Sequence, residues 1–144
     1  MYYNTELHFL QEFPVPTGPG WRVATAEDIE RVRNPAPTAA AIAARRYEAE
    51  VGGITMNGLQ INTDDRSKLL INGAALEATI DPAYVMQWKT TGGFVELNAQ
   101  QVIGIARAVR AHVQACFDRE AELLAALEAG TLTEEMLGLG WPAG

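Results

Sequence analysis

The longest helical pattern in the sequence lies between residues 98 and 130. Asn98, with Gln101 three residues later, is a pair that caps the start of a helix, and Gly130 is typical of a helix end. A helix of about 30 residues and about 45 Å is therefore predicted between them. Short hairpins and short helices in a 144-residue chain are unable to cover all of it, so part of its apolar side should need another helix or another chain.

The apolar residues of this helix follow steps of four and three, close to a heptad seam. Interrupted by Glu120, the seam contains Val102, Ala106, Val109, Val113, Cys116, Leu123 and Leu127. We expect the preceding elements to cover its first half. Leu123, Leu124 and Leu127 are predicted to lie beyond the edge of the domain and to bind a second copy or another protein. Trp141, in the Gly-rich C-terminal segment, is a further candidate partner-binding residue.

Charged residues on the same helix have two interpretations. The group consists of Arg107, Arg110, Arg119, Glu120 and Glu122. A solvated face, with pairs three and four residues apart, is the simpler one. A charged interface with another chain is the alternative.

Two hairpins are predicted before the long helix. Asn57-Gly58 is typical of a type I′ turn, and the alternation around it predicts a half-buried hairpin over residues 54–61. Gly92-Gly93 lies in the turn of a second hairpin over residues 84–97, in which Trp88 should face the core.

Two shorter helices separate these hairpins from the N-terminal part. Thr38 is predicted to cap a helix that ends at Gly52-Gly53, and Thr63 to cap another that ends at Asp81-Pro82. In the second of these helices, the residues expected to face the core are Leu69, Leu70, Ala74 and Leu76 or Ala78.

The N-terminal residues 1–33 predict a small β-rich module. Strands are expected around residues 7–10 and 21–24, and Trp21 should anchor the module's small core. Thr25 with Asp28 approximates a capping box, which starts a short helix. The prolines in residues 34–38 stop that helix and form a linker. The fold class is therefore α+β: the N-terminal module, the linker, and a domain of two hairpins and three helices over residues 39–144.

Composition argues against several classes of partner. The net charge is −7, and Arg45-Arg46 is the one doubly basic pair, which disfavours nucleic acid and anionic membranes. Met1 begins a segment without a basic or an apolar signal region, and no apolar run is long enough to span a bilayer. The single cysteine suits a reducing compartment. We expect a soluble protein made in a cytoplasm.

Residues able to support catalysis are few. His8 and His112 are predicted to be surface or interface histidines, and Cys116 a buried, unreactive thiol. Asp64 and Asp65 lack the spacing of a calcium loop, and the glycine pairs lack a phosphate-binding pattern. No convincing pair of carboxylates suggests a glycan-cleaving enzyme. The sequence therefore predicts a non-enzymatic protein without a metal or cofactor.

A family resemblance extends from about residue 46 to residue 128. It rests on RYEAEVGGI at 46–54, INTDDR at 61–66, INGA at 71–74, WK at 88–89 with GFV at 93–95, and AHVQACFDRE at 111–120. These segments resemble DUF4376, an uncharacterised domain family common in phage and prophage tail genes. Residues 1–33 are loosely similar to the front of tail-fibre assembly chaperones.

The resemblance implies a phage tail-fibre assembly protein that binds a tail-fibre or baseplate protein. It also implies presence in the host cytoplasm during assembly. The alternative is a structural component retained in the tail of the virion, as part of the fibre or baseplate. The family carries no catalytic residues onto this chain.

Overall fold

The computed structural model describes residues 1–143, which form two compact units that divide between Pro37 and Thr38. Helices and small antiparallel sheets occur together, and the predicted α+β class is confirmed.

The first unit is a three-stranded antiparallel sheet with one helix. β1 (Tyr2–Asn4) lies between β2 (Phe9–Gln11) and β3 (Trp21–Val23), and α1 (Ala26–Arg33) follows. The predicted capping box is present, because Thr25 and Asp28 each bond the other's backbone amide. Asp28 also binds Arg22 of β3, which fixes α1 to the sheet.

The start of this unit differs from the sequence prediction. Residues 5–8 form a turn rather than part of a strand, and β1 precedes them. Asn4 organises the turn, since its side chain accepts hydrogen bonds from the amides of Glu6 and Leu7. His8 ends it at φ 54° and shares a 2.7 Å hydrogen bond with the Tyr3 hydroxyl. Trp21 packs edge-on against Phe9.

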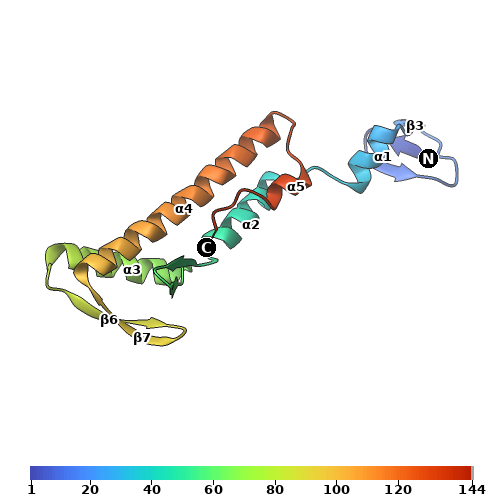
Figure 1. The fold of residues 1–144 in the computed structure, drawn as a ribbon. Helices are drawn as coiled ribbons and strands as arrows, with labels where there is room; N and C mark the ends of the chain where they lie inside the picture. Colours follow the sequence, from blue (N-terminus) through green and yellow to red (C-terminus); the bar gives the residue numbers. More distant parts are fainter. Residues whose placement is uncertain (144) are drawn as a thin grey trace. The chain divides into compact units, whose positions relative to one another are not determined.

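The second unit is organised along one long helix, α4 (Ala99–Glu128), as Figure 1 shows. Before it come α2 (Ala39–Glu50), the hairpin β4–β5 (Ile54–Met56 and Leu59–Ile61), α3 (Asp65–Ile80) and the hairpin β6–β7 (Val85–Thr90 and Gly93–Asn98). The short α5 (Glu134–Leu137) follows. α3 packs against the first half of α4, whereas α2 packs further along it.

The turn and cap residues predicted for the second unit are confirmed for both hairpins and for most helix caps. Asn57 and Gly58 have positive φ angles of 50° and 78°, as a type I′ turn requires. Thr38 caps α2, and Asn98 with Gln101 forms a capping box at α4. The prediction of Thr63 as the cap of α3 is wrong, because Asp64 accepts the hydrogen bond from the Ser67 amide.

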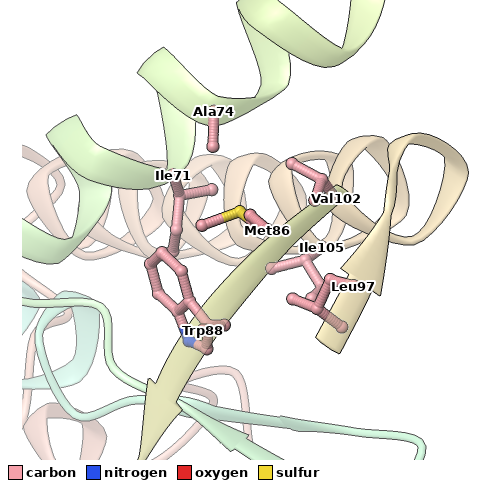
Figure 2. A pocket seen from close by; sticks show the side chains of 7 residues that line it. All are labelled: Ile71, Ala74, Met86, Trp88, Leu97, Val102 and Ile105. Atoms are coloured by element: carbon pink, nitrogen blue, oxygen red, sulfur yellow. The ribbon is translucent and has the colours of Figure 1, made fainter. Parts of the chain in front are cut away.

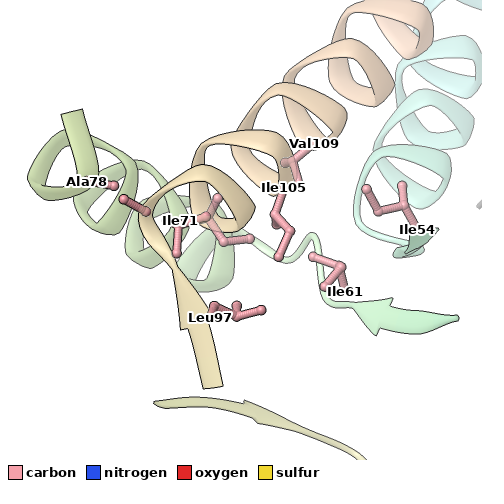
Figure 3. Close-up of a cluster of buried hydrophobic side chains, with 9 residues drawn as sticks. Ile54, Ile61, Ile71, Ala78, Leu97, Ile105 and Val109 are labelled. Atoms are coloured by element: carbon pink, nitrogen blue, oxygen red, sulfur yellow. The ribbon is translucent and has the colours of Figure 1, made fainter. Parts of the chain in front are cut away.

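The larger core of this unit lies where α3, α4 and the two hairpins meet. Its buried residues are Ile54, Ile61, Ile71, Ala78, Leu97, Ala99, Val102, Ile105 and Val109, most of which are labelled in Figure 3. The buried residues that α3 contributes to this core are Ile71 and Ala78. Leu69 and Leu70 were expected there, but both are exposed because they lie on the sides of α3 that face away from α4. Of the alternatives Leu76 and Ala78, the structure buries Ala78 and leaves Leu76 exposed.

Candidate protein-docking site

The predicted partner-binding leucines of α4 have different surroundings. Leu123 is fully buried and packs with Ile42 of α2 and Leu137 of α5. The prediction that it lies beyond the edge of the domain is therefore wrong, because α2 and α5 cover this end of α4. Leu127 is half-buried against the same cluster. Leu124 is 39% exposed and keeps a surface that a partner can reach.

Trp141 is docked on the second unit instead of lying on a free tail. Its indole nitrogen donates a 2.6 Å hydrogen bond to the Leu137 carbonyl, and its ring packs against the Leu123 cluster. Arg119 holds the same segment, donating to the carbonyls of Leu139 and Met136. The side chain of Arg119 is thus largely covered, and it also forms the expected pair with Glu122, three residues further on, at 2.9 Å.

An open groove lies between α3 and β6, outside these predicted residues. Its volume is about 580 Å³, and its lining comprises Asn62, Ser67, Leu69, Leu70, Gly73, Ala74, Tyr84, Met86, Gln87, Trp88 and Lys89. The helix contributes Leu70 and the glycine at position 73, while the strand contributes the successive residues 86–89, which include Met86 and Trp88. Most of this surface is apolar, which is typical of sites that accept apolar side chains of a ligand or a partner.

The floor of the groove is continuous with the core. Met86 and Trp88 of β6 point toward Ile71 and Ala74 of α3, as Figure 2 shows. Between them and α4 only about 10 Å³ of space remains, lined by apolar side chains alone. Because Met86 and Trp88 are already packed from below, a partner would meet a supported surface and not a collapsible one.

The groove carries one charged side chain, Lys89, among its lining residues. Within residues 1–143, Lys89 takes part in no ion pair. Asn62, Ser67 and Gln87 add hydrogen-bonding groups at the surface. The groove therefore combines apolar contact area with a cation that favours an acidic neighbour.

Sequence reasoning missed this groove because it placed Leu69 and Leu70 in the core. The spacing of the residues does indicate the error. Leu69, Leu70 and Ile71 follow one another and therefore point in three different directions around the helix, so they cannot all face the core. The approach of β6 to α3 depends on long-range packing, which no local pattern indicates.

A half-buried ion cluster joins α2, α3 and α4 at a separate place. Glu50 accepts hydrogen bonds from Arg46 and, at 2.5 Å, from Lys68, while Arg46 also donates to Glu120 at 2.9 Å. Burial alone would raise the pKa of Glu50, but the bonds from Lys68 and Arg46 outweigh burial and keep that pKa below its usual value. Every charge in the cluster is paired, so it ties the three helices together.

His112 and Cys116 lie beside this cluster. The prediction of a surface or interface position for His112 is wrong: the ring is buried, and its Nε2 donates to the Ala49 carbonyl at 2.9 Å. It occupies this place because the buried line of α4 steps from Val109 to His112 and Cys116, one residue from the predicted Val113. Cys116 is buried as predicted, and burial raises the pKa of its thiol.

Within residues 1–143, no group of three or more His, Cys, Asp and Glu side chains is placed to hold a metal ion. In the same range, no helix combines the length and apolar character needed to cross a membrane.

Comparison with known proteins gives one family and no individual relative. No curated protein and no solved structure matches the chain. The family model described as domain of unknown function DUF4376 matches residues 33–137, which covers more than half of the chain and nearly all of the second unit. The chain therefore belongs to the DUF4376 family.

Proposed function

We propose that the second unit binds another protein, and that the groove between α3 and β6 is the binding site. The observation that carries the proposal is the groove itself: an apolar surface supported from below, with hydrogen-bonding groups in its lining and a cation, Lys89, that forms no ion pair within residues 1–143. A segment that presents two or three apolar side chains, with an acidic residue placed near Lys89, matches this chemistry.

The biological setting that we propose is phage tail assembly. The support is the resemblance described above, in which the family is associated with phage and prophage tail genes. In this proposal the partner is a tail-fibre or baseplate protein, and the protein acts as an assembly chaperone in the host cytoplasm. Apolar surface on an unassembled fibre would be covered until its own partner arrives.

A non-catalytic role fits the surroundings of the reactive side chains. His112 already uses its Nε2 for a backbone carbonyl, and Cys116 is buried with a raised pKa. A buried thiol with a raised pKa is a poor nucleophile. The proposal therefore rests on contact, and needs no nucleic acid, membrane or cofactor.

The test is co-expression with the neighbouring fibre gene, followed by purification of the complex. Leu70→Glu places a charge in the groove at a position that is 53% exposed, so the fold should tolerate it. Leu124→Glu is the matched control on α4, outside the groove. We expect wild type and Leu124→Glu to keep the fibre soluble and to co-purify with it, and Leu70→Glu to lose both properties.

The opposite pattern would contradict the groove as the binding site. If Leu124→Glu loses the fibre while Leu70→Glu retains it, the exposed side of α4 is the binding surface, as the sequence first indicated. If no variant and no wild-type chain associates with the fibre, the chaperone proposal itself fails.

A structural role in the virion is the alternative function. A structural component of the fibre or baseplate would be present in purified virions at a fixed copy number, whereas an assembly chaperone would be absent from them. Quantitative mass spectrometry of purified particles separates the two.

A further inference from the structure

We propose that a second copy of this chain docks antiparallel on the outer side of α3. The contact surface is the outer stripe, which we define as Leu69, Gly73, Leu76 and Ile80. This inference does not depend on the proposed phage-tail role, because it concerns association of the chain with itself. Leu69 and Gly73 belong to both surfaces, so a second copy and a groove-bound partner would compete for them.

The spacing of the outer stripe places its members on one side of the helix. Successive steps of four, three and four residues keep all of them within about 60° around the helix axis. Ile71 and Ala78 lie on the opposite side, where they are buried in the core. α3 is thus apolar on two sides, and packing within the unit covers only one.

The members of the outer stripe are strongly exposed. Leu69 is 72%, Leu76 is 64% and Ile80 is 70% accessible to solvent. Three large aliphatic side chains aligned on one helix face form an exposed apolar row, and exposed apolar surface of this kind marks protein interfaces. Single exposed leucines need no explanation, but an aligned row does.

Gly73 gives the outer stripe a shape that suits a second helix. Apart from its chain neighbours and the adjacent backbone of α3, no atom of residues 1–143 lies within 4 Å of the place where a Cβ would be at this position. A helix backbone from a partner can therefore approach α3 closely at its middle, between Leu69 and Leu76. The helix of 16 residues offers a contact line of about 24 Å.

The charges beside the outer stripe identify a second copy as the occupant. Arg66 lies near the start of α3, and Glu77 and Asp81 lie near its end on the same flank. All three are exposed, and none takes part in an ion pair within residues 1–143. An antiparallel copy brings Arg66 of each chain beside the acidic end of the other, whereas a parallel copy would leave Arg66 and the acidic residues at opposite ends of the pair.

This arrangement is self-complementary, as a twofold interface requires. The same residues serve both chains, so each apolar contact and each ion pair occurs twice. A stable interface covers about 800 Å² on each partner. The outer stripe would form its centre, and flanking residues such as Leu70 and Asn72 would complete it.

The first experiment measures the mass of the full chain in solution by sedimentation equilibrium. We expect wild type to approach twice the 15.6 kDa of one chain as concentration rises to the order of 1 mM. Leu76→Glu should remain a monomer, with an unchanged circular dichroism spectrum because position 76 is exposed. Leu124→Glu, a matched change on α4, should associate like wild type.

The second experiment tests the antiparallel orientation by exchanging charges. Arg66→Glu should weaken association on the order of two- to tenfold, since it places an acidic side chain of each copy beside the acidic end of α3 in the other copy. Adding Glu77→Arg to that variant should recover the loss. A monomeric wild type, association that survives Leu76→Glu, or a double variant no tighter than Arg66→Glu alone would each overturn the proposal.

Discussion

Leu123→Ala should destabilise the second unit strongly, although the heptad pattern alone places this residue at a partner interface. Leu123 has no exposed surface, and it packs with Ile42 and Leu137 from two other helices. Removing three carbons leaves a cavity that three helices would have to close together. Changes of this kind cost about 2–5 kcal/mol, and full burial places Leu123 in the upper part of that range.

Leu124→Ala is the matched control, because it removes the same atoms one position further along α4. Leu124 keeps 39% of its surface, so we expect its loss to cost no more than about 1 kcal/mol. Urea unfolding gives both free energies, and a thermal scan should separate the two variants by roughly 10 °C or more. Equal unfolding midpoints for Leu123→Ala and Leu124→Ala would refute the buried cluster of Leu123, Ile42 and Leu137. They would favour the interpretation of Leu123 as an interface residue.

Three further predictions concern the turn, the thiol and the first unit. Gly58→Val should lower the free energy of unfolding by about 1 kcal/mol or more, because Gly58 has a φ of 78° that a β-branched residue adopts only with strain; an unchanged urea midpoint would refute the turn. Cys116 should react slowly with a thiol reagent in the native protein, since it is buried and its pKa is raised, and rapid labelling would show that α4 opens there. Asp28 should make the first unit acid-sensitive, because the hydrogen bonds from Arg22 and Thr25 hold its pKa well below its usual value. The folded state then binds fewer protons than the unfolded state, so stability is present above about pH 4 and is lost as the pH falls further. NMR of the first unit should show less of this loss in Asp28→Asn, and an equal loss would exclude Asp28 as its cause.

Local chemistry explains why so many boundaries were predictable. A capping pair such as Asn98 with Gln101 satisfies backbone amides within one turn, and Asn57-Gly58 supplies two positive φ angles without help from distant residues. Each of these signals determines where an element starts or reverses. The order of strands and helices in the second unit, including the long α4, follows from them.

Tertiary packing explains the positions that were predicted wrongly. Thr63 and Asp64 are both good caps, and Asp64 takes the role because the Thr63 hydroxyl oxygen accepts instead from the Gly53 amide at 2.9 Å while its proton goes to the Glu50 carbonyl. Leu123 looked uncovered because α5 has only four residues and Trp141 lies in a segment without regular structure, both later in the chain than α4. Which of two equivalent neighbours is buried depends on contacts that sequence spacing does not contain.

α3 presents the same problem in a form that bears on function. The sequence offers apolar residues at Leu69, Leu70, Ile71, Leu76 and Ile80, too many for one side of a 16-residue helix. Packing against α4 selects Ile71 for the core and leaves the others outside, where Leu69 and Leu70 border the groove and the rest continue the outer stripe. A chain that needed α3 only for its own core would gain solubility from polar residues at those places. The fold of the monomer therefore does not require the exposed apolar residues of α3. These residues lie in the groove and in the outer stripe, where the two proposed interfaces need apolar surface.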